Sequence, residues 1–596
     1  MLYQGENLNY NKDLIVACRG DGFGERMLAL LNAMYIANRL NIKFKFSWKY
    51  FNFQKENNVN FIDAMSSVPK EDMLFAREFI NKYSCTQSMN VCAVDGIGLF
   101  LKNGKYRLEK LFDYESGYDF GYVSTQYDLS KICEDVEHEE YYSSLKNIWK
   151  QIHFSEKLQE IINFVETYND SYIAVHIRSG DALYKYNRRD IFFSKKKILD
   201  VNLALKVINF ESLDKNNKII IFSDDLDAKQ HIKDFFKDRN NIFTVEDFKI
   251  YKDVFSQTFF ELLLMSKSKK IYSSGSSGFS QLACRISNKA EFISIYSLYT
   301  EQEQYDIIRF YINKIDFNNY SKAFSYFKLY LLSDYLKLSI SLQKKYLFQA
   351  MKLDPVCNVY IILFIHLLAR EKKILDLELF LKKMFFQKKD ILIEDFLFVN
   401  VYDYSFLYFF VFEEIFKNIK DTDKFVNIRY LFYRLYLRMK ENQNIKKFDE
   451  RMMKFLDYNF NHYNFNHFMF ENKICNISAV KRVKEHLSYK IGYVTILLYR
   501  RKLIFLTPFA HIMVFINFMI NKIIYKCAKK YNSDLIFPLL ENCYDYQEAL
   551  KVKEYLSYKL GKVFIRAYKN WYKGGGIKLI FDIIKLKKNF KEKNKS

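Results

Sequence analysis

Glycine and proline are scarce in this chain, whose 596 residues include only 17 glycines and 4 prolines. Lysine, asparagine, isoleucine, phenylalanine and tyrosine are plentiful instead, a bias typical of proteins encoded by AT-rich bacterial genomes. The formal net charge of +23 partly reflects this bias, so local clusters of basic residues are a better guide to partners than the total. Half of the residues are apolar, which excludes an intrinsically disordered chain.

The chain also lacks the patterns that mark disulfide frameworks, nucleic-acid modules and secretion. Its nine cysteines are scattered without a CxxC pair, which favours reduced, mostly buried thiols in a cytoplasmic protein. No zinc module and no ribonucleoprotein motif occurs, so we do not expect a nucleic-acid partner. The first residues show no basic segment followed by an apolar stretch, so no signal peptide is expected.

Length and periodicity predict several domains, with room for about three to five. The first 300 residues alternate short apolar runs with helical patterns, which predicts parallel α/β sheets covered on both faces. In such sheets ligands bind at the carboxyl ends of the strands. The predicted strands are Asp13–Cys18, Ser171–Ile177, Lys218–Phe222, Lys270–Tyr272 and Glu291–Ile295, and Met27–Leu40 is the first predicted helix.

After residue 300 the pattern becomes helical. Residues 353–355 (LDP) end one predicted helix before the next begins, as in a tetratricopeptide-type helix pair. Residues 483–492 (VKEHLSYKIG) recur as 552–561 (VKEYLSYKLG), which suits two copies of a small helical module. The predicted helices are Tyr320–Leu338, Gln343–Lys352, Val356–Arg370 and Asp376–Phe386.

Two segments near the end of the chain suggest a membrane surface. Leu503–Ile520 has about the minimum length for a bilayer span, but it contains a threonine, a proline, a histidine and an asparagine, each costly in hydrocarbon. A buried or interfacial helix is the prediction there, and a spanning helix is the alternative. Lys569–Ser596 interleaves lysines with apolar and aromatic residues, typical of a helix on an anionic surface; a solvated tail is the alternative.

The first candidate site segment is a glycine-rich turn, Arg19–Arg26 (RGDGFGER), between a strand and a helix. Gly20, Gly22 and Gly24 allow a tight turn and a close backbone approach to a ligand, and the N-terminus of the following helix attracts anions. The pattern is not GxGxxG, so it does not support a dinucleotide site. A purely structural turn is the alternative.

The second segment is AVHIRSGD, residues 174–181. Strand alternation sends His176 and Arg178 to the same side of the sheet, and Asp181 follows the strand. An arginine fork at this place can bind a diphosphate and stabilise the charge that builds on a departing nucleotide. An Arg–Asp ion pair that closes the sheet edge is the alternative.

The third segment is a pair, FSDD at 222–225 and SSGSSGFS at 273–280, each after a predicted strand. Hydroxyl groups and free backbone N–H groups in the second member predict a phosphate cradle before a helix. Asp224 or Asp225 is positioned to accept hydrogen bonds from a base or ribose. A metal-binding DxD formed by Asp225 and Asp227 is the alternative. The cradle residues are Ser276, Ser277, Gly278 and Phe279.

HxRxGD, FSDD and the serine-rich segment, in this order and spacing, resemble the three donor-site motifs of the fucosyltransferase superfamily, which includes bacterial α1,2-, α1,6- and protein O-fucosyltransferases. The resemblance covers residues 13–298. It implies a two-Rossmann (GT-B) architecture, a GDP-fucose donor, inversion of the anomeric centre, and no metal or other cofactor. The glycine-rich turn resembles the acceptor-side turn of the family, with Asp21 at the place of a residue near the catalytic centre.

The resemblance also assigns roles to the site residues. Arg178 would hold the donor phosphates, and residues 276–279 would line them. His176 and Asp181 would shape the site, while Asp224 and Asp225 would read the nucleoside.

Two departures from the family bear on the donor. Ser179 stands where many members have a second arginine, and Arg19–Glu25 replaces the common GGxGNQ turn. Asp21 is the first candidate for the general base and Glu25 is the second. If neither is suitably placed, stabilisation of the leaving group by Arg178 and the helix N-terminus would carry the reaction.

The sequence therefore predicts an α/β, metal-independent, inverting glycosyltransferase that acts on a bacterial surface polysaccharide or another glycan, free or on a lipid carrier. Its expected partners are a GDP-linked sugar and the anionic inner face of the cytoplasmic membrane. Transfer of another nucleotide-activated, phosphoryl-type group onto capsular polysaccharide, or a non-catalytic scaffold, is the alternative. The predicted domains are 1–165 (acceptor-side Rossmann-like), 166–300 (donor-side Rossmann-like), 301–470 (α-helical) and 471–596 (basic helical module).

Overall fold

The computed structural model divides the chain into two compact units, Met1–Lys446 and Lys447–Ser596. The finer division into four domains remains a prediction. The residues that the structure describes are 13–50, 68–89, 106–113, 118, 120–184, 191, 195–287, 289–399, 406–418, 425–441, 452, 454, 456, 479–531 and 546–593.

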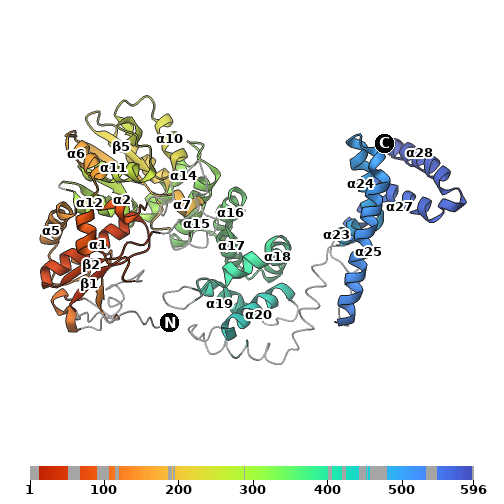
Figure 1. Ribbon diagram of the computed structural model, residues 1–596, viewed down its shortest axis with the longest axis horizontal. Coiled ribbons are helices and arrows are strands. Elements are labelled where there is room, and N and C mark those ends of the chain that lie inside the picture. The colour runs from red at the N-terminus through yellow and green to blue at the C-terminus, as the bar shows by residue number, and fades with distance from the viewer. Residues whose placement is uncertain are drawn as a thin grey trace. The chain divides into compact units, whose positions relative to one another are not determined.

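The first unit begins with a three-stranded parallel sheet in the order β2-β1-β3. Figure 1 shows α1 beside β1 and β2. Every residue of β1 is buried, as expected of a parallel strand covered on both faces. The elements of this part are β1 (Leu14–Ala17), α1 (Phe23–Leu40), β2 (Lys43–Phe46), α2 (Glu71–Leu74), α3 (Arg77–Tyr83), η2 (Leu108–Asp113), β3 (Gly121–Val123), α4 (Leu129–Ile132), α5 (His138–Gln151) and α6 (Glu156–Glu166).

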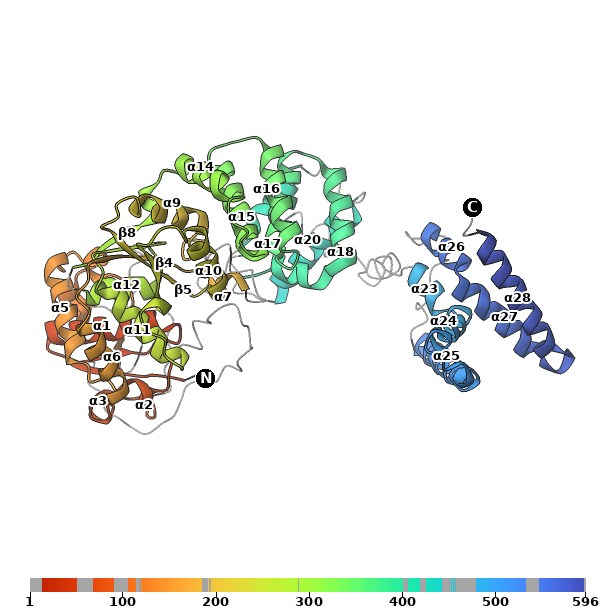
Figure 2. The same cartoon turned by 90° about the horizontal axis from the view of Figure 1, so that it is seen from above.

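A second parallel sheet follows, with five strands in the order β6-β5-β4-β7-β8. Strand order reverses at β4, so the chain leaves β4 toward one edge and later places β7 on the other side of it; this is a topological switch point. Figure 2 shows α9 on one side of the sheet and α11 and α12 on the other. The elements are β4 (Tyr172–Ile177), α7 (Gly180–Tyr184), α9 (Val201–Glu211), β5 (Lys218–Ser223), α10 (Leu226–Phe235), β6 (Ile242–Thr244), η4 (Val245–Asp247), α11 (Val254–Ser266), β7 (Lys270–Ser273), α12 (Gly278–Ile286), β8 (Glu291–Ser294) and α13 (Ile295–Leu298).

The predicted fold class, two Rossmann-like α/β parts followed by helices, is confirmed. The five predicted strands correspond to β1, β4, β5, β7 and β8. The sequence did not predict β2, β3 or β6. The strands β3 and β6 have only three residues each, and in β2 (KFKF) lysine alternates with phenylalanine, so none of the three gives a continuous apolar run.

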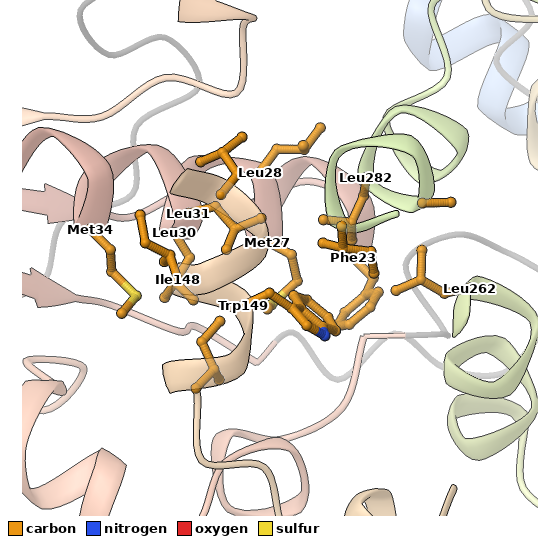
Figure 3. Close-up of a cluster of buried hydrophobic side chains, with 14 of the residues drawn as sticks. Phe23, Met27, Leu28, Leu30, Leu31, Met34, Ile148, Trp149, Leu262 and Leu282 are labelled. Atoms are coloured by element: carbon orange, nitrogen blue, oxygen red, sulfur yellow. The ribbon is translucent and has the colours of Figure 1, made fainter. Parts of the chain in front are cut away.

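One hydrophobic core joins the two sheets through the helices between them. The helix α1 packs against α5 and α12, and α11 packs against α6 and α12. Because these helices are shared, the two α/β parts hold each other in place around the groove where their strand ends meet. Figure 3 shows this core, with Phe23, Met27, Leu28, Leu30, Leu31 and Met34 from α1, Ile148 and Trp149 from α5, Leu262 from α11, and Leu282 from α12.

Helices follow the second sheet, and successive ones pack on each other. The helix α16 ends at Leu353, with Asp354 at its C-cap and Pro355 just beyond, as the sequence predicted. The four predicted helices match α15 to α18 to within three residues at their starts. The helix α18 is kinked at Lys388, two residues after the predicted end, and a second helical segment continues to Phe396. The elements are α14 (Glu301–Tyr311), α15 (Asn319–Tyr335), α16 (Ile340–Leu353), α17 (Asn358–Arg370), α18 (Ile374–Phe396), α19 (Phe409–Asn418) and α20 (Val426–Glu441).

The second unit contains both copies of the repeated sequence. Each copy forms a short helix, a one-residue break and a longer helix, so α23 and α24 correspond to α26 and α27. The long helices cross at their glycines: a Cβ on Gly492 would collide with the carbonyl oxygen of Ser557, and one on Gly561 with that of Ser488. The elements are α23 (Ala479–Glu485), α24 (Leu487–Arg500), η5 (Ile504–Leu506), α25 (Thr507–Tyr531), α26 (Tyr546–Glu554), α27 (Leu556–Lys569), η7 (Trp571–Lys573) and α28 (Gly575–Lys593).

The apolar segment Leu503–Ile520 is not one continuous helix. It starts in η5 and enters α25 at Thr507, with Pro508 in the first turn, where a missing N–H costs nothing. Among the helices that the structure describes, none combines the length and the apolar character needed to cross a membrane.

Candidate active site

A cavity of about 280 Å³ lies at the carboxyl ends of β4 and β5, beside the switch point, and the start of α1 forms its opposite wall. It brings together all three segments that the sequence singled out. Gly20, Asp225 and Ser276 are the predicted site residues that do not line it. The described lining residues are Asp21, Gly22, Phe23, Gly24, Glu25, His176, Arg178, Asp181, Lys197, Ser223, Asp224, Thr258, Glu261, Ser277, Gly278 and Phe279.

Two helix N-termini face this cavity. Gly22 is the N-cap residue of α1 and has no side chain that could cap this helix. Ser277 is the N-cap residue of α12, and its hydroxyl makes no capping hydrogen bond among the described residues. The first N–H groups of each helix therefore receive no hydrogen bond from their own N-cap side chain, and such groups attract anions. A Cβ on Gly24 would lie 2.6 Å from both the Gly278 carbonyl carbon and the Phe279 nitrogen. The sequence predicted that the backbone of the glycine-rich turn approaches a ligand closely. In the structure, the close approach at Gly24 is to the backbone of α12.

Glu25 lies at this junction. Its carboxylate is so near Gly278 that a Cβ there would collide with it, and Lys197 Nζ is 3.3 Å from Glu25 Oε1. The N-terminal end of a helix favours negative charge. The carboxylate of Glu25 is therefore held by both the start of α12 and the Lys197 ammonium.

Arg178 projects from the end of β4 and forms ion pairs with Asp181 and Asp224. The ion pair that the sequence left as an alternative is therefore present, while the Arg178 side chain, 19% exposed, still lines the cavity. Asp224 Oδ1 also accepts hydrogen bonds from the backbone N–H groups of Ser179 (2.8 Å) and Gly180 (2.9 Å). Asp224 thus fixes both the turn after β4 and the guanidinium of Arg178.

Asp225 is fully buried behind the cavity wall. Its Oδ1 caps α10 by accepting from the Ala228 N–H at 3.0 Å, and its Oδ2 accepts from the Tyr184 hydroxyl at 3.1 Å. Burial raises the pKa of this carboxyl. Ser276 also faces elsewhere, donating its hydroxyl to the Lys196 carbonyl at 2.6 Å. Among the described residues no group of three or more His, Cys, Asp or Glu side chains is arranged to hold a metal ion.

Asp21 is paired with a buried arginine. Arg19 Nε lies 3.0 Å from Asp21 Oδ1 and 3.1 Å from Oδ2, and Arg19 also donates to Gln126 Oε1 at 2.5 Å. The arrangement anchors the turn before α1. It also balances the charge of the carboxylate that the sequence ranked first as general base.

His176 is buried on the cavity wall, with its ring against that of Phe279 at a centroid distance of 5.6 Å. Burial, together with the nearby Arg178 charge, lowers the pKa of the imidazole to about 3, so it is neutral at physiological pH. Its Nδ1 has no hydrogen-bond partner among the described residues. A buried polar atom without a partner is costly, and a ligand in the cavity can supply one.

Glu261 on α11 is a site residue that the sequence analysis missed. Its Oε1 accepts a hydrogen bond from Gln257 Nε2 at 3.1 Å. Burial raises the pKa of its carboxyl to about 7, although the charge of Lys229 and this hydrogen bond each lower the pKa. The other carboxylates that line the described cavity all form ion pairs, whereas Glu261 forms none with the described residues. The available signal was a single acidic residue inside the apolar run FFELLLM at 259–265.

Comparisons with known proteins give three results. A family model described as a domain of unknown function (DUF8374) matches residues 412–592. No curated protein matches the chain by sequence. Among solved structures, the fucosyltransferase NodZ from Bradyrhizobium is similar with 13% identity and a TM-score of 0.29, over 48% of this chain and 96% of NodZ. POFUT1 in complex with GDP-fucose is similar with 13% identity and a TM-score of 0.28, over 48% of this chain and 98% of POFUT1.

Proposed function

We propose that the α/β part of this chain is a glycosyltransferase that moves a sugar from a nucleotide diphosphate to a hydroxyl group of a glycan, with inversion and without a metal. The observation that carries the proposal is the meeting of two uncapped helix N-termini, those of α1 and α12, at one cavity that also contains Arg178 and Lys197. Helix N-termini and cations in one cavity suit a diphosphate. The cavity volume, about 280 Å³, is near the lower end of the range for small-molecule sites.

Arg178 and Lys197 would stabilise the leaving group. The carboxylates of Asp181 and Asp224 orient the Arg178 guanidinium, which has further N–H groups for the oxygens of a diphosphate. Lys197 supplies a second cation where Ser179 replaces the second arginine of the resembled family. Charge that develops on the departing diphosphate would thus meet fixed positive groups, which is where electrostatic catalysis is most effective.

The reaction also needs a base for the acceptor hydroxyl. As that proton leaves, the hydroxyl oxygen forms a bond to the anomeric carbon, and the bond from that carbon to the phosphate oxygen breaks, with its electron pair passing to the diphosphate. Asp21 and Glu25 are both held in ion pairs, whereas Glu261 is not. A carboxyl with a pKa of about 7 is well suited to accept a proton near neutral pH, so we assign the base to Glu261 ahead of the other two.

The motif resemblance makes GDP-fucose the first donor to test. Purified full-length protein would be heated with GDP-, UDP-, CDP- and dTDP-linked sugars, because a ligand at a hundred times its Kd stabilises by about 2.7 kcal/mol. Stabilisation by one nucleotide class, and release of its nucleoside diphosphate in the presence of EDTA, is the expected result. Absence of any shift would contradict a nucleotide-sugar site. Activity abolished by EDTA and restored by Mn²⁺ would instead require a metal-dependent mechanism.

We further propose that the second unit, Lys447–Ser596, holds the enzyme against an anionic membrane face. Residues 479–531 contain a single acidic residue, Glu485, and the exposed bases Arg500, Arg501 and Lys502 precede η5. Each basic residue close to an anionic leaflet contributes about 1 kcal/mol. A glycan that grows on a lipid carrier would then be within reach of the transferase. Exposed apolar side chains next to these bases are Ile504, Phe505, Leu506, Phe509, Ile512, Met513, Phe515, Ile516 and Met519.

A further inference from the structure

Another cavity, of about 480 Å³, lies in the second unit, between α24, α25 and α27. Its volume falls within the range of small-molecule sites. Apolar side chains make up most of its wall, so its chemistry differs from that of the cavity in the α/β part. The described lining residues are Leu487, Ile491, Pro508, His511, Ile512, Phe515, Ile565, Tyr568 and Lys569.

Two polar side chains on the wall, His511 and Tyr568, form hydrogen bonds within the protein. Thr495 donates its hydroxyl to the Ile491 carbonyl at 2.8 Å, so its oxygen accepts from His511 Nε2, which lies 2.7 Å away. His511 Nδ1 is then the acceptor for the Tyr568 hydroxyl at 2.8 Å. This chain of bonds ties α24, α25 and α27 together. It leaves His511 no donor or acceptor for a ligand, and water in the cavity would have few partners, as in apolar cavities that stay dry.

The mouth of the cavity has exposed apolar side chains and one positive charge. Ile512 and Phe515 of α25 are 57% and 50% exposed, and Lys569 at the end of α27 is the charged residue among the described lining. We infer that this cavity binds the hydrocarbon chain of a lipid whose phosphate group pairs with Lys569. The site is separate from the transfer reaction and does not depend on it.

The surroundings favour a lipid over a protein as the occupant. The exposed bases Arg500, Arg501 and Lys502 lie at the end of α24 and on the turn that follows it, where they complement anionic headgroups. Trp571 and Tyr572, just after α27, are 76% and 68% exposed, and these residue types favour the boundary between water and membrane. A hydrocarbon chain that leaves a membrane next to such a surface passes directly into an apolar cavity.

The test uses the full-length protein and cis-parinaric acid, a fatty acid that fluoresces in apolar cavities. Farnesyl phosphate and oleoyl lysophosphatidic acid are then added separately as competitors, one with an isoprenoid chain and one with an acyl chain. Saturable displacement by either supports the site, and the stronger competitor identifies the kind of chain. Farnesol, which has no phosphate, should compete at least about tenfold more weakly than farnesyl phosphate, as expected for one charge-assisted contact.

Two pairs of variants locate the binding. Ile512→Glu places a charge at the cavity mouth and should weaken binding of cis-parinaric acid at least about tenfold, whereas Ile580→Glu changes an equally exposed isoleucine of α28 and should not. Lys569→Glu should remove the preference for farnesyl phosphate over farnesol. Lys585 is also exposed, and Lys585→Glu should keep this preference. The proposal would be overturned if both variants of a pair changed binding to the same extent, or if cis-parinaric acid showed no saturable binding. So would a dimer in sedimentation that Ile512→Glu dissociates, because a second copy would then be the occupant.

Discussion

Gly24 and Gly278 bring the first turns of α1 and α12 into contact: a Cβ on Gly24 would lie 2.6 Å from the carbonyl carbon of Gly278. Gly24 lies in the helix that follows β1 of the first sheet, and Gly278 lies in the helix that follows β7 of the second sheet. Their contact places the positive ends of two helices on one cavity, which is the arrangement that the proposed diphosphate site requires.

Gly24→Ala should therefore destabilise the protein. Alanine in place of glycine inside a helix normally stabilises by up to about 1 kcal/mol, but here the new methyl group meets backbone atoms, and overpacking costs about 1–3 kcal/mol. We expect a lower thermal midpoint and weaker nucleotide binding. Gly576→Ala is the matched control, because a Cβ there meets nothing within 4 Å and the residue lies in α28. An unchanged or raised midpoint for Gly24→Ala would show that the helices separate easily.

Arg178→Ala should lower the rate of sugar transfer by about a hundredfold or more, comparable to the loss of one strong donor to the transition state. The substitution also leaves Asp181 and Asp224 without their shared cation, so circular dichroism and the thermal midpoint must accompany the kinetics. Arg309→Ala, on the exposed side of α14, is the control and should leave the rate unchanged. Near-normal turnover by a folded Arg178→Ala protein would remove Arg178 from the mechanism.

Glu261 predicts a pH dependence of the rate. Its carboxyl, with a pKa of about 7, must be ionised to accept a proton, so kcat/KM should fall as the pH drops through about 7. Glu261→Gln should lose most of the activity and this inflection together, while nucleotide binding remains. If the variant keeps the wild-type pH profile, Asp21 or Glu25 becomes the better candidate for the base.

The same group should affect stability in the opposite direction. The pKa of Glu261 is raised in the folded state from 4.5, so its contribution to stability is fully present below pH 4.5 and is lost as the pH rises through about 7. Glutamine stays neutral and avoids this loss. Glu261→Gln should therefore exceed the wild type in stability at pH 8 by up to about 3 kcal/mol, with little difference at pH 4.5. Unfolding in urea at the two pH values measures it.

Membrane association should depend on local charge. Replacing Arg500, Arg501 and Lys502 by glutamate should strongly reduce co-sedimentation with vesicles that contain phosphatidylserine at low salt, because each base contributes about 1 kcal/mol. The control replaces three exposed lysines of the first unit, Lys215, Lys237 and Lys382, and should still bind. Equal binding by both triple variants would mean that total charge, and not this surface, is responsible.

The sequence by itself determined the positions of five strands, including β4 and β5, and which polar segments follow them. Buried parallel strands such as β4 and β5 appear as continuous apolar runs, and the polar motifs that follow them must share one edge of the sheet. That reasoning predicted the segments around Gly24, Arg178 and Gly278 that line the cavity. This prediction succeeded because each motif consists of a few consecutive residues.

Only the tertiary structure decided which of these residues face the cavity and in what state of charge. Asp225 follows β5 as Asp224 does, yet it caps α10 and is buried, whereas Asp224 reaches Arg178. Glu261 reaches the same cavity from the middle of α11, where local sequence indicates a core helix. Burial and ion pairing depend on contacts between residues far apart in the chain, so no local pattern specifies that Asp21 is paired and Glu261 is not.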